Sequence, residues 1–326
     1  MRDEIDPEIL AARKLQAPVL AGADVTRLSA AEARALANRA AMLFNDGQPE
    51  LARVEDFEIA SAGGTMRARI YEPVDARPEG SIFYVHGGGW LAYDVDTHDR
   101  TLRFLADASG LSLLAFDFRL SPENPYPAAL DDCRRAWEWL HQVGASLGVA
   151  TDQVAIGGDS AGGNMGLALA IDCRDRGGPA PVGLALAYAC FAPGLETESR
   201  RRYSARVFGL TPERMDWHWA CYLGPHAADP PPLAAPLHAE LAGLPPVYLG
   251  IAQCDVVADD SRLLADRLAA AEIPVQVDVW AGATHGVLQM TRDVQIARTA
   301  ATSMAQALGR FVRVGEDDVG PRSRLG

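Results

Sequence analysis

Short, almost wholly apolar runs recur along the chain from residue 81 onward, with stretches long enough for helices between them. Strands buried on both faces of a sheet have this continuous apolar pattern, and intervening helices indicate right-handed parallel crossovers. The pattern predicts a doubly wound α/β sheet. Its strands are expected at 81–85, 111–116, 153–156, 182–190, 246–251 and 275–280, and its helices at 127–147, 161–176 and 259–271.

A hairpin is predicted ahead of this sheet. Apolar residues alternate with acidic ones at 57–59 and with arginines at 66–70. Alternation with a period of two is typical of a strand with one buried face, and Gly63-Gly64 between the two runs predicts a turn. We therefore expect an antiparallel hairpin at one edge of the sheet.

Two segments stand outside the alternation of strands and helices. Residues 1–50 are predicted to be helical, because Ser29 and Glu32 have the spacing of a capping box. Residues 194–240 are too long for a simple connection and begin a helix at Thr211-Pro212. This insertion is rich in aromatic residues, which either cover a site or pack the insertion onto the domain. The predicted organisation is an N-terminal helical cap segment at 1–50, a core at 51–193 and 241–314, a cap insertion at 194–240 and a flexible tail at 315–326.

Composition narrows the class of protein. Among 326 residues, 48% are apolar and 22% are charged, as in ordinary globular enzymes. The net charge of −13 disfavours nucleic acid and anionic membrane surfaces as partners. Because the sequence has no 18-residue apolar run and no signal-type N-terminus, we expect no membrane span and a cytoplasmic location. Five cysteines without a CxxC pair and seven histidines without ligand spacing predict free thiols and no metal.

The segment Gly158-Asp159-Ser160-Ala161-Gly162 matches the pattern GxSxG. Alone this pattern is a weak signal, but here it directly follows a predicted strand and opens a predicted helix. That setting is the one a nucleophile elbow requires, and small flanking residues relieve the crowding around its strained serine. We expect Ser160 to be a nucleophile; a tight structural turn is the alternative.

Three consecutive glycines follow His86 at the end of the strand predicted at 81–85. Glycines let peptide N–H groups approach a substrate oxygen closely, and with the N–H of Ala161 they predict an oxyanion hole. A plain glycine turn is the alternative. We expect His86 to order this loop through a hydrogen bond rather than to act as a base, and Asp117 and Arg119 to fix the loop after the strand at 111–116.

A histidine base and an acid should follow the nucleophile in the order serine, acid, histidine. His285 follows the strand predicted at 275–280 and is the only histidine after residue 238. Asp255 lies at the carboxyl end of the strand predicted at 246–251. Asp259 and Asp260 are rivals for the acid, but they fall at the start of the next helix, where capping explains them better.

These residues together resemble the hormone-sensitive-lipase-like family of bacterial esterases, within the α/β-hydrolase superfamily. The resemblance implies a mostly parallel eight-stranded sheet flanked by helices, with a helical cap built from the N-terminal segment and an insertion after the sixth strand. It covers about residues 80–290, and its motifs are HGGGW at 86–90, DFRLSPENPYPAALDD at 117–132, GDSAGGN at 158–164, LAGLPPVYLGIAQCDVVADD at 241–260 and HG at 285–286.

The resemblance also implies chemistry. Its members hydrolyse short-to-medium acyl esters without a cofactor, so we expect a serine carboxylesterase whose partner is a small-molecule ester. The implied catalytic residues are Ser160, Asp255 and His285, the implied oxyanion donors are Gly88, Gly89 and Ala161, and the expected substrate pocket includes Trp90, Phe44, Trp217 and Val287. The sequence departs from the family at Phe118, Ser121, Val256-Val257 and Val287, which leaves the acyl-length preference open.

Three other functions stay open. An amidase or formamidase could use the same three residues, and a lipase could act on long-chain triglyceride. The gibberellin receptor resembles this family and does not catalyse, but it lacks the catalytic histidine, whereas His285 is present here. Whether the chain forms a homodimer is left open.

Overall fold

A single eight-stranded sheet forms the centre of the computed structural model, which describes residues 4–312. The strand order is β1-β2-β4-β3-β5-β6-β7-β8, in which β2 runs antiparallel to both neighbours and the other pairs are parallel. The predicted parallel sheet with its edge hairpin is confirmed. The strands are β1 (Arg53–Ser61), β2 (Gly64–Glu72), β3 (Ser81–Val85), β4 (Ser112–Phe116), β5 (Val154–Asp159), β6 (Leu184–Ala187), β7 (Val247–Cys254) and β8 (Val275–Thr284).

Burial explains the two hydrophobic patterns. Every residue of β3, β4 and β5 is buried, as continuous apolar runs require. In the hairpin, Ile59 pairs with Met66 and both are buried, whereas their neighbours along each strand are not. The tight turn is Ala62-Gly63, one position earlier than predicted, because Gly64 already pairs with Ser61.

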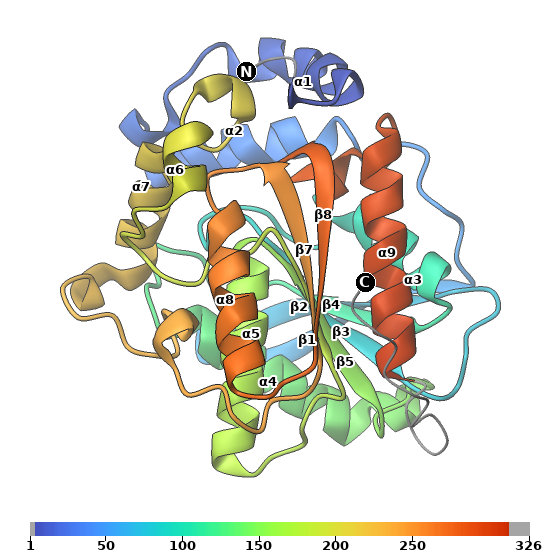
Figure 1. The fold of residues 1–326 in the computed structure, drawn as a ribbon. Helices are drawn as coiled ribbons and strands as arrows, with labels where there is room; N and C mark the ends of the chain where they lie inside the picture. The colour runs from blue at the N-terminus through green and yellow to red at the C-terminus, as the bar shows by residue number, and fades with distance from the viewer. Residues whose placement is uncertain (1–3, 313–326) are drawn as a thin grey trace, which may run out of the picture.

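Helices cover both faces of the sheet. Figure 1 shows α3 and α9 on one face, and α4, α5 and α8 on the other. The helices α1, α2, α6 and α7 gather beyond the ends of β7 and β8 (Figure 1). Their bounds are α1 (Pro7–Leu20), α2 (Ala30–Met42), α3 (Asp99–Ser109), α4 (Ala128–Val143), α5 (Ala161–Arg176), α6 (Glu198–Arg202), α7 (Pro212–Leu223), α8 (Ala258–Ala270) and α9 (Gln295–Phe311).

The predicted helix starts have the expected caps. The Ser29 hydroxyl accepts from the Glu32 N–H, and the Glu32 carboxylate accepts from the Ser29 N–H, which completes the capping box of α2. At the start of α7, the Thr211 hydroxyl accepts from the Arg214 N–H, ahead of the proline at the first helical position. The predicted tail at 315–326 lies outside the described residues.

One arginine joins the N-terminal segment to the insertion. From α1, Arg13 donates to the carbonyl oxygens of Val207 (2.7 Å) and Phe208 (2.9 Å), and to Oγ1 of Thr284 (2.7 Å). Burial lowers the pKa of Arg13 to about 10, although nearby Asp255 raises it. Arg13 therefore connects two segments far apart in sequence at a point directly before His285.

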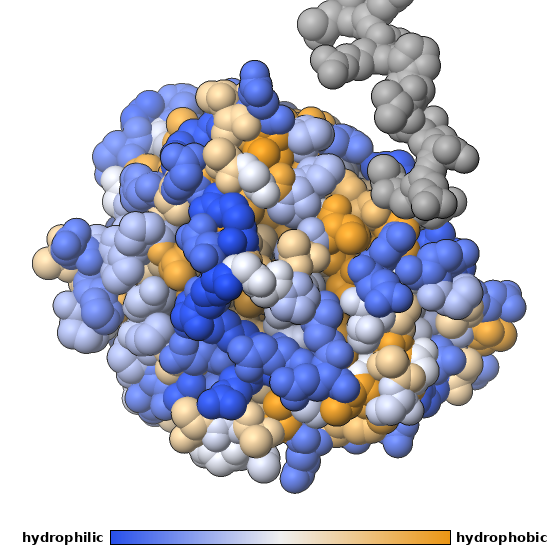
Figure 2. Space-filling model, turned by 90° about the horizontal axis from the view of Figure 1, so that it is seen from below, coloured by the Kyte–Doolittle hydropathy of each residue, from blue (hydrophilic) through white to orange (hydrophobic). Residues whose placement is uncertain are grey.

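The surface away from α1, α2, α6 and α7 is mainly hydrophilic. Figure 2 shows this face from below, with apolar areas scattered among polar residues. None of the helices between residues 4 and 312 combines the length and the apolar character that a membrane span requires.

Replacing Arg13 with methionine tests this connection. Arg13→Met removes three hydrogen bonds and leaves two partly buried carbonyls unsatisfied, so we expect the free energy of unfolding to fall by about 2–4 kcal/mol. Urea unfolding measures this change. Lys14→Met, at the exposed next position of α1, is the matched control and should change the free energy by less than about 0.5 kcal/mol. Equal effects of the two substitutions would contradict the assigned role of Arg13.

Candidate active site

Ser160 lies in a strained turn between β5 and α5. Its backbone has φ 52° and ψ −122°, and its N–H donates to the Ala187 carbonyl at 2.9 Å. A residue other than glycine rarely adopts a positive φ, and it keeps this strained conformation only where the surrounding contacts hold it. Gly162 is part of this fixation, because a Cβ there would collide with the carbonyl oxygens of Val85 and His86. The turn thus packs directly against the end of β3, as the elbow pattern predicts.

Hydrogen bonds join the three predicted catalytic side chains into one chain. Ser160 Oγ lies 2.9 Å from His285 Nε2, and His285 Nδ1 lies 2.6 Å from Asp255 Oδ2. Asp255 follows the end of β7 and its side chain is fully buried. Its other oxygen accepts from the Val257 N–H at 3.2 Å, which fixes the carboxylate in place. His285 follows the end of β8, so three strand ends bring the side chains together.

The rival acids bind elsewhere. Asp259 accepts from the Ser199 N–H at 2.8 Å and pairs with Arg262, and Asp260 accepts from the Phe191 N–H at 2.9 Å. Both lie in the first turn of α8, as predicted, but neither carboxylate accepts a capping hydrogen bond from an N–H of that helix. Both instead hold the chain that leaves β6. Burial, together with the charge of Asp255, raises the pKa of Asp260 to about 7.

The glycine turn after β3 presents unengaged N–H groups. The Gly87 N–H donates to Asp159 Oδ1 at 2.9 Å. Within the described part of the chain, the N–H groups of Gly88, Gly89 and Ala161 donate to no other group. Ala161 is the first residue of α5, where the N–H has no partner inside the helix. Gly88 and Gly89 have φ of 121° and 63°, which favour glycine.

A buried carboxylate holds this turn against the elbow. Asp159 accepts hydrogen bonds from the Tyr84 hydroxyl (3.0 Å), the Tyr188 hydroxyl (3.3 Å) and the Gly87 N–H. His98 Nε2 lies 3.4 Å from it. Burial raises the pKa of Asp159, but His98 and the hydrogen-bond donors outweigh burial and hold that pKa below its usual value. Sequence reasoning missed this role, although Asp159 stands inside the GxSxG motif.

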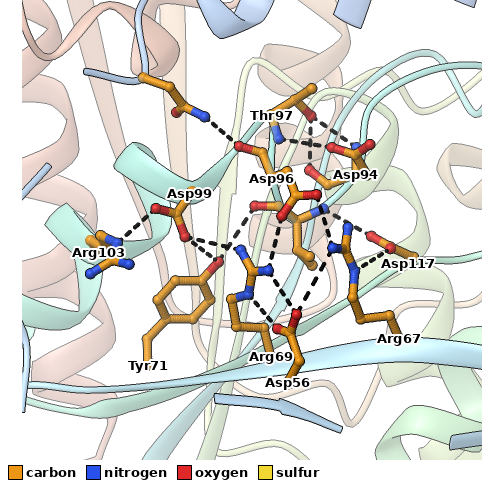
Figure 3. A network of polar contacts seen from close by, with 12 residues as sticks. Asp56, Arg67, Arg69, Tyr71, Asp94, Asp96, Thr97, Asp99, Arg103 and Asp117 are labelled. Atoms are coloured by element: carbon orange, nitrogen blue, oxygen red, sulfur yellow. Dashed lines mark hydrogen bonds and ion pairs between the residues drawn. The ribbon is translucent and has the colours of Figure 1, made fainter. Parts of the chain in front are cut away.

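Arginines of β2 anchor the segment that follows the glycine turn. Arg67 pairs with Asp96 (2.9 Å) and Asp117 (3.0 Å), and Arg69 pairs with Asp96 (2.9 Å), as Figure 3 shows. Asp117 also accepts from the Val95 N–H at 2.8 Å. Asp117 therefore ties residues 94–99 to the hairpin, beyond the loop that it was expected to fix.

Arg119 and His86 complete the support of these loops. Arg119 pairs with the buried Asp132 at 2.8 Å. His86 Nδ1 lies 2.7 Å from the Gly87 carbonyl, and its ring stacks on Phe118 at 4.3 Å between centroids. Burial lowers the pKa of His86 to about 4, so the ring is neutral near pH 7. This geometry is compatible with the loop-ordering role expected for it.

The predicted pocket residues occupy different surroundings. Trp90 is fully buried and stacks on Tyr222 of α7 at 4.2 Å between ring centroids. Phe44 and Val287 are buried in the main core, and Trp217 packs on a small separate cluster of the buried residues Ala33, Leu91 and Ala92. Their roles in a substrate pocket stay predictions.

One further residue on α7 reaches the glycine turn. A Cβ on Gly89 would collide with the imidazole of His218, so this ring lies directly against the turn. Burial, together with the charge of Arg214, lowers the pKa of His218 well below its usual value. Sequence reasoning did not find His218, because no spacing relates it to the motifs.

The pKa of Asp260 predicts a pH dependence of stability. Between pH 4 and pH 7 the folded state keeps the Asp260 proton whereas the unfolded state loses it, so this group makes stability fall as pH rises to about 7. Asp260→Asn removes the contribution. The free energy of unfolding, measured by urea at several pH values, should therefore decrease less over this range in the variant.

Asp259→Asn is the matched control for this measurement. Burial raises the pKa of Asp259, but the Ser199 N–H and Arg262 outweigh it and lower that pKa, so its contribution changes only below about pH 4. The control should keep the wild-type slope between pH 4 and pH 7. Equal slopes for wild type and Asp260→Asn would overturn the assignment.

Comparisons with known proteins agree with this architecture. The sequence profile of a family described as alpha/beta hydrolase fold matches residues 82–289. Carboxylesterase NlhH of Mycobacterium tuberculosis is 32% identical over 316 residues, which cover 95% of this chain and 97% of that protein. Carboxylic ester hydrolase LipN of the same organism is 35% identical over 248 residues, which cover 73% of this chain and 65% of that protein.

Solved structures show the same likeness. A hyperthermophilic esterase from the archaeon Pyrobaculum calidifontis superposes with a TM-score of 0.87 at 30% sequence identity, and the match covers 94% of this chain and 98% of that one. The chain therefore belongs to the hormone-sensitive-lipase-like family of the alpha/beta hydrolase superfamily.

Proposed function

We propose that this protein hydrolyses carboxylic esters of short-to-medium acyl chain through an acyl-enzyme intermediate on Ser160. The continuous hydrogen-bond chain from Asp255 through His285 to Ser160 carries the proposal. Ester hydrolysis is also the activity in the names of the related mycobacterial proteins.

In the proposed first half of the reaction, Ser160 Oγ attacks the ester carbonyl carbon while His285 Nε2 takes its proton. His285 is held by a short hydrogen bond to Asp255, which fixes the tautomer and stabilises the imidazolium that forms. The carbonyl oxygen becomes an oxyanion, and the N–H groups of Gly88, Gly89 and Ala161 are the proposed donors to it. His285 then protonates the leaving alcohol.

In the second half, a water molecule attacks the acyl group on Ser160. His285 takes the proton of this water and returns it to Ser160 Oγ as the ester bond to the enzyme breaks. The carboxylic acid leaves and the enzyme is restored. No step needs a group beyond these side chains, the backbone donors and water.

A series of p-nitrophenyl esters from acetate to palmitate tests the proposal. Initial rates should peak between acetate and octanoate, and Ser160→Ala should lower kcat by at least about a thousandfold because the nucleophile is gone. Ser204→Ala, an exposed serine of the insertion, is the control and should keep the wild-type rate. A Ser160→Ala variant that keeps a tenth of the rate would refute the nucleophile. A peak at palmitate would indicate a lipase, and turnover of p-nitroacetanilide alone would indicate an amidase.

Gly89→Ala tests the oxyanion donors. The added Cβ would collide with the His218 ring and must accept a φ of 63°, so the turn has to move its N–H groups. Displacing such a donor typically costs about 3 kcal/mol of transition-state stabilisation, which predicts a loss of about a hundredfold in kcat/KM for p-nitrophenyl butyrate.

Gly148→Ala is the matched control for this substitution. Its φ is 77°, but no atom lies within 4 Å of the added Cβ. It should cost about 1 kcal/mol of stability through backbone strain and leave kcat/KM unchanged. Normal turnover by a folded Gly89→Ala variant would contradict the proposed donor role of this turn.

A further inference from the structure

Helix α7 is docked directly over the glycine turn. The Trp90 ring is parallel to the Tyr222 ring within 6°, and it also contacts Trp219, 4.6 Å away between centroids. The imidazole of His218 lies against Gly89 on the same side. These contacts fix the rotation of α7, so the helix face that carries His218 is turned toward the candidate active site.

Arg214 lies on this face, because residues four apart are neighbours on a helix surface. Its Nε atom is buried and has no hydrogen-bond partner within residues 4–312. Its guanidinium also forms no ion pair with a carboxylate in that part of the chain. The acidic residues beside it on α7 are exposed, and one of them, Asp216, pairs with Arg200 at 2.6 Å.

Other positive or polar groups of the site surround Arg214. Its charge lowers the pKa of Arg13 and of His218. The charge also lowers the pKa of Tyr93, although burial raises that pKa more, and the Tyr93 ring lies against Gly88. Arg214 therefore lies near residues that contact the glycine turn and near Arg13, and Arg13 already donates to two carbonyls and a hydroxyl.

Arg214 lacks the carboxylate partner that several other arginines of the molecule have. Arg200 pairs with Asp216, and Arg67 and Arg69 each bind carboxylates. A partly desolvated guanidinium without an acceptor is unfavourable, and a carboxylate satisfies its planar donor fork best. No carboxylate within residues 4–312 pairs with Arg214, and His218, four residues further along the same helix face, lies against the glycine turn of the site.

We propose that Arg214 binds a carboxylate of the substrate, and that the preferred substrate is an ester carrying an ionised carboxylate a few bonds from the scissile carbonyl. This inference rests on the proposed ester hydrolysis and narrows its substrate class. The negative charge of the substrate would replace the missing partner of Arg214 in the cap. A neutral ester of the same length leaves that guanidinium unpaired and gains nothing from it.

Four esters test the proposal with the whole chain. Monomethyl glutarate carries the charge in its acyl half, and methyl valerate is its neutral counterpart. Acetoxyacetate carries the charge in its alcohol half, and propyl acetate is its neutral counterpart. Arg214→Met should lower kcat/KM for at least one anionic ester by about ten- to hundredfold, the worth of a charge-assisted hydrogen bond, and change the neutral esters by less than about threefold. Acid release in a pH-stat measures all four.

Two variants separate binding from structure. Arg214→Lys keeps the charge but loses the donor fork, so it should recover part of the lost kcat/KM. Arg206→Met removes an exposed arginine of the same insertion and should leave all four substrates unchanged. Equal losses on charged and neutral esters, or no loss on either, would overturn the proposal.

The wild-type protein provides a test that needs no variant. Free glutarate should inhibit the hydrolysis of p-nitrophenyl butyrate competitively, and 1,5-pentanediol at the same concentration should not. Lack of inhibition by glutarate counts against the carboxylate site. A wild-type protein inactive on p-nitrophenyl butyrate instead refutes the proposed function, whereas normal activity without any Arg214 dependence refutes only this inference.

Discussion

The buried carboxylate of Asp159 connects the two backbone turns on which the candidate site depends. Asp159 is the last residue of β5, directly before Ser160, and it accepts from the N–H of Gly87 in the glycine turn. Two tyrosine hydroxyls and His98 satisfy the rest of this carboxylate. A buried charge is tolerated only when it is paired and hydrogen-bonded. Moving any partner away from Asp159 would therefore cost free energy, and this cost keeps each partner in place. This carboxylate therefore holds the proposed nucleophile and the proposed oxyanion donors next to each other.

The remaining supports surround this connection. The ion pairs of Arg67 and Arg69 with the loop after the glycine turn (Figure 3) join the edge hairpin to the site. On the other side, Asp259 and Asp260 hold the chain that leaves β6. Only three side chains are proposed to be catalytic. The carboxylates of Asp159, Asp259 and Asp260 instead accept hydrogen bonds from backbone N–H groups of the surrounding loops. The ion pairs and buried carboxylates thus position the loops around the site, and the proposed catalysis depends on the positions of these loops.

Sequence alone predicted the sheet and the residues at its strand ends. Continuous apolar runs identify buried strands because both faces are covered, and the elbow and the glycine turn each follow such a run. His285 follows β8, an edge strand of which most residues are not buried. The strand bounds were less exact: β6 is shorter than its apolar run, because burial in the main core continues past the strand through Tyr188, Ala189 and Cys190, and burial alone produces an apolar pattern. Sequence analysis did not find Arg13, Arg214 and His218, because their contacts depend on how separate segments pack. The local hydrophobic periodicity of the sequence contains no information about that packing.

Arg13 ties the N-terminal segment to the insertion. Its guanidinium on α1 is held by carbonyl oxygens of the insertion and by the residue before His285. Recombination between relatives that exchanges only the insertion would replace the carbonyl groups that Arg13 binds while leaving Arg13 itself in place. Chimaeras of this fold should therefore take α1 and the insertion from the same parent, because α1 supplies the donor of this contact and the insertion supplies its acceptors.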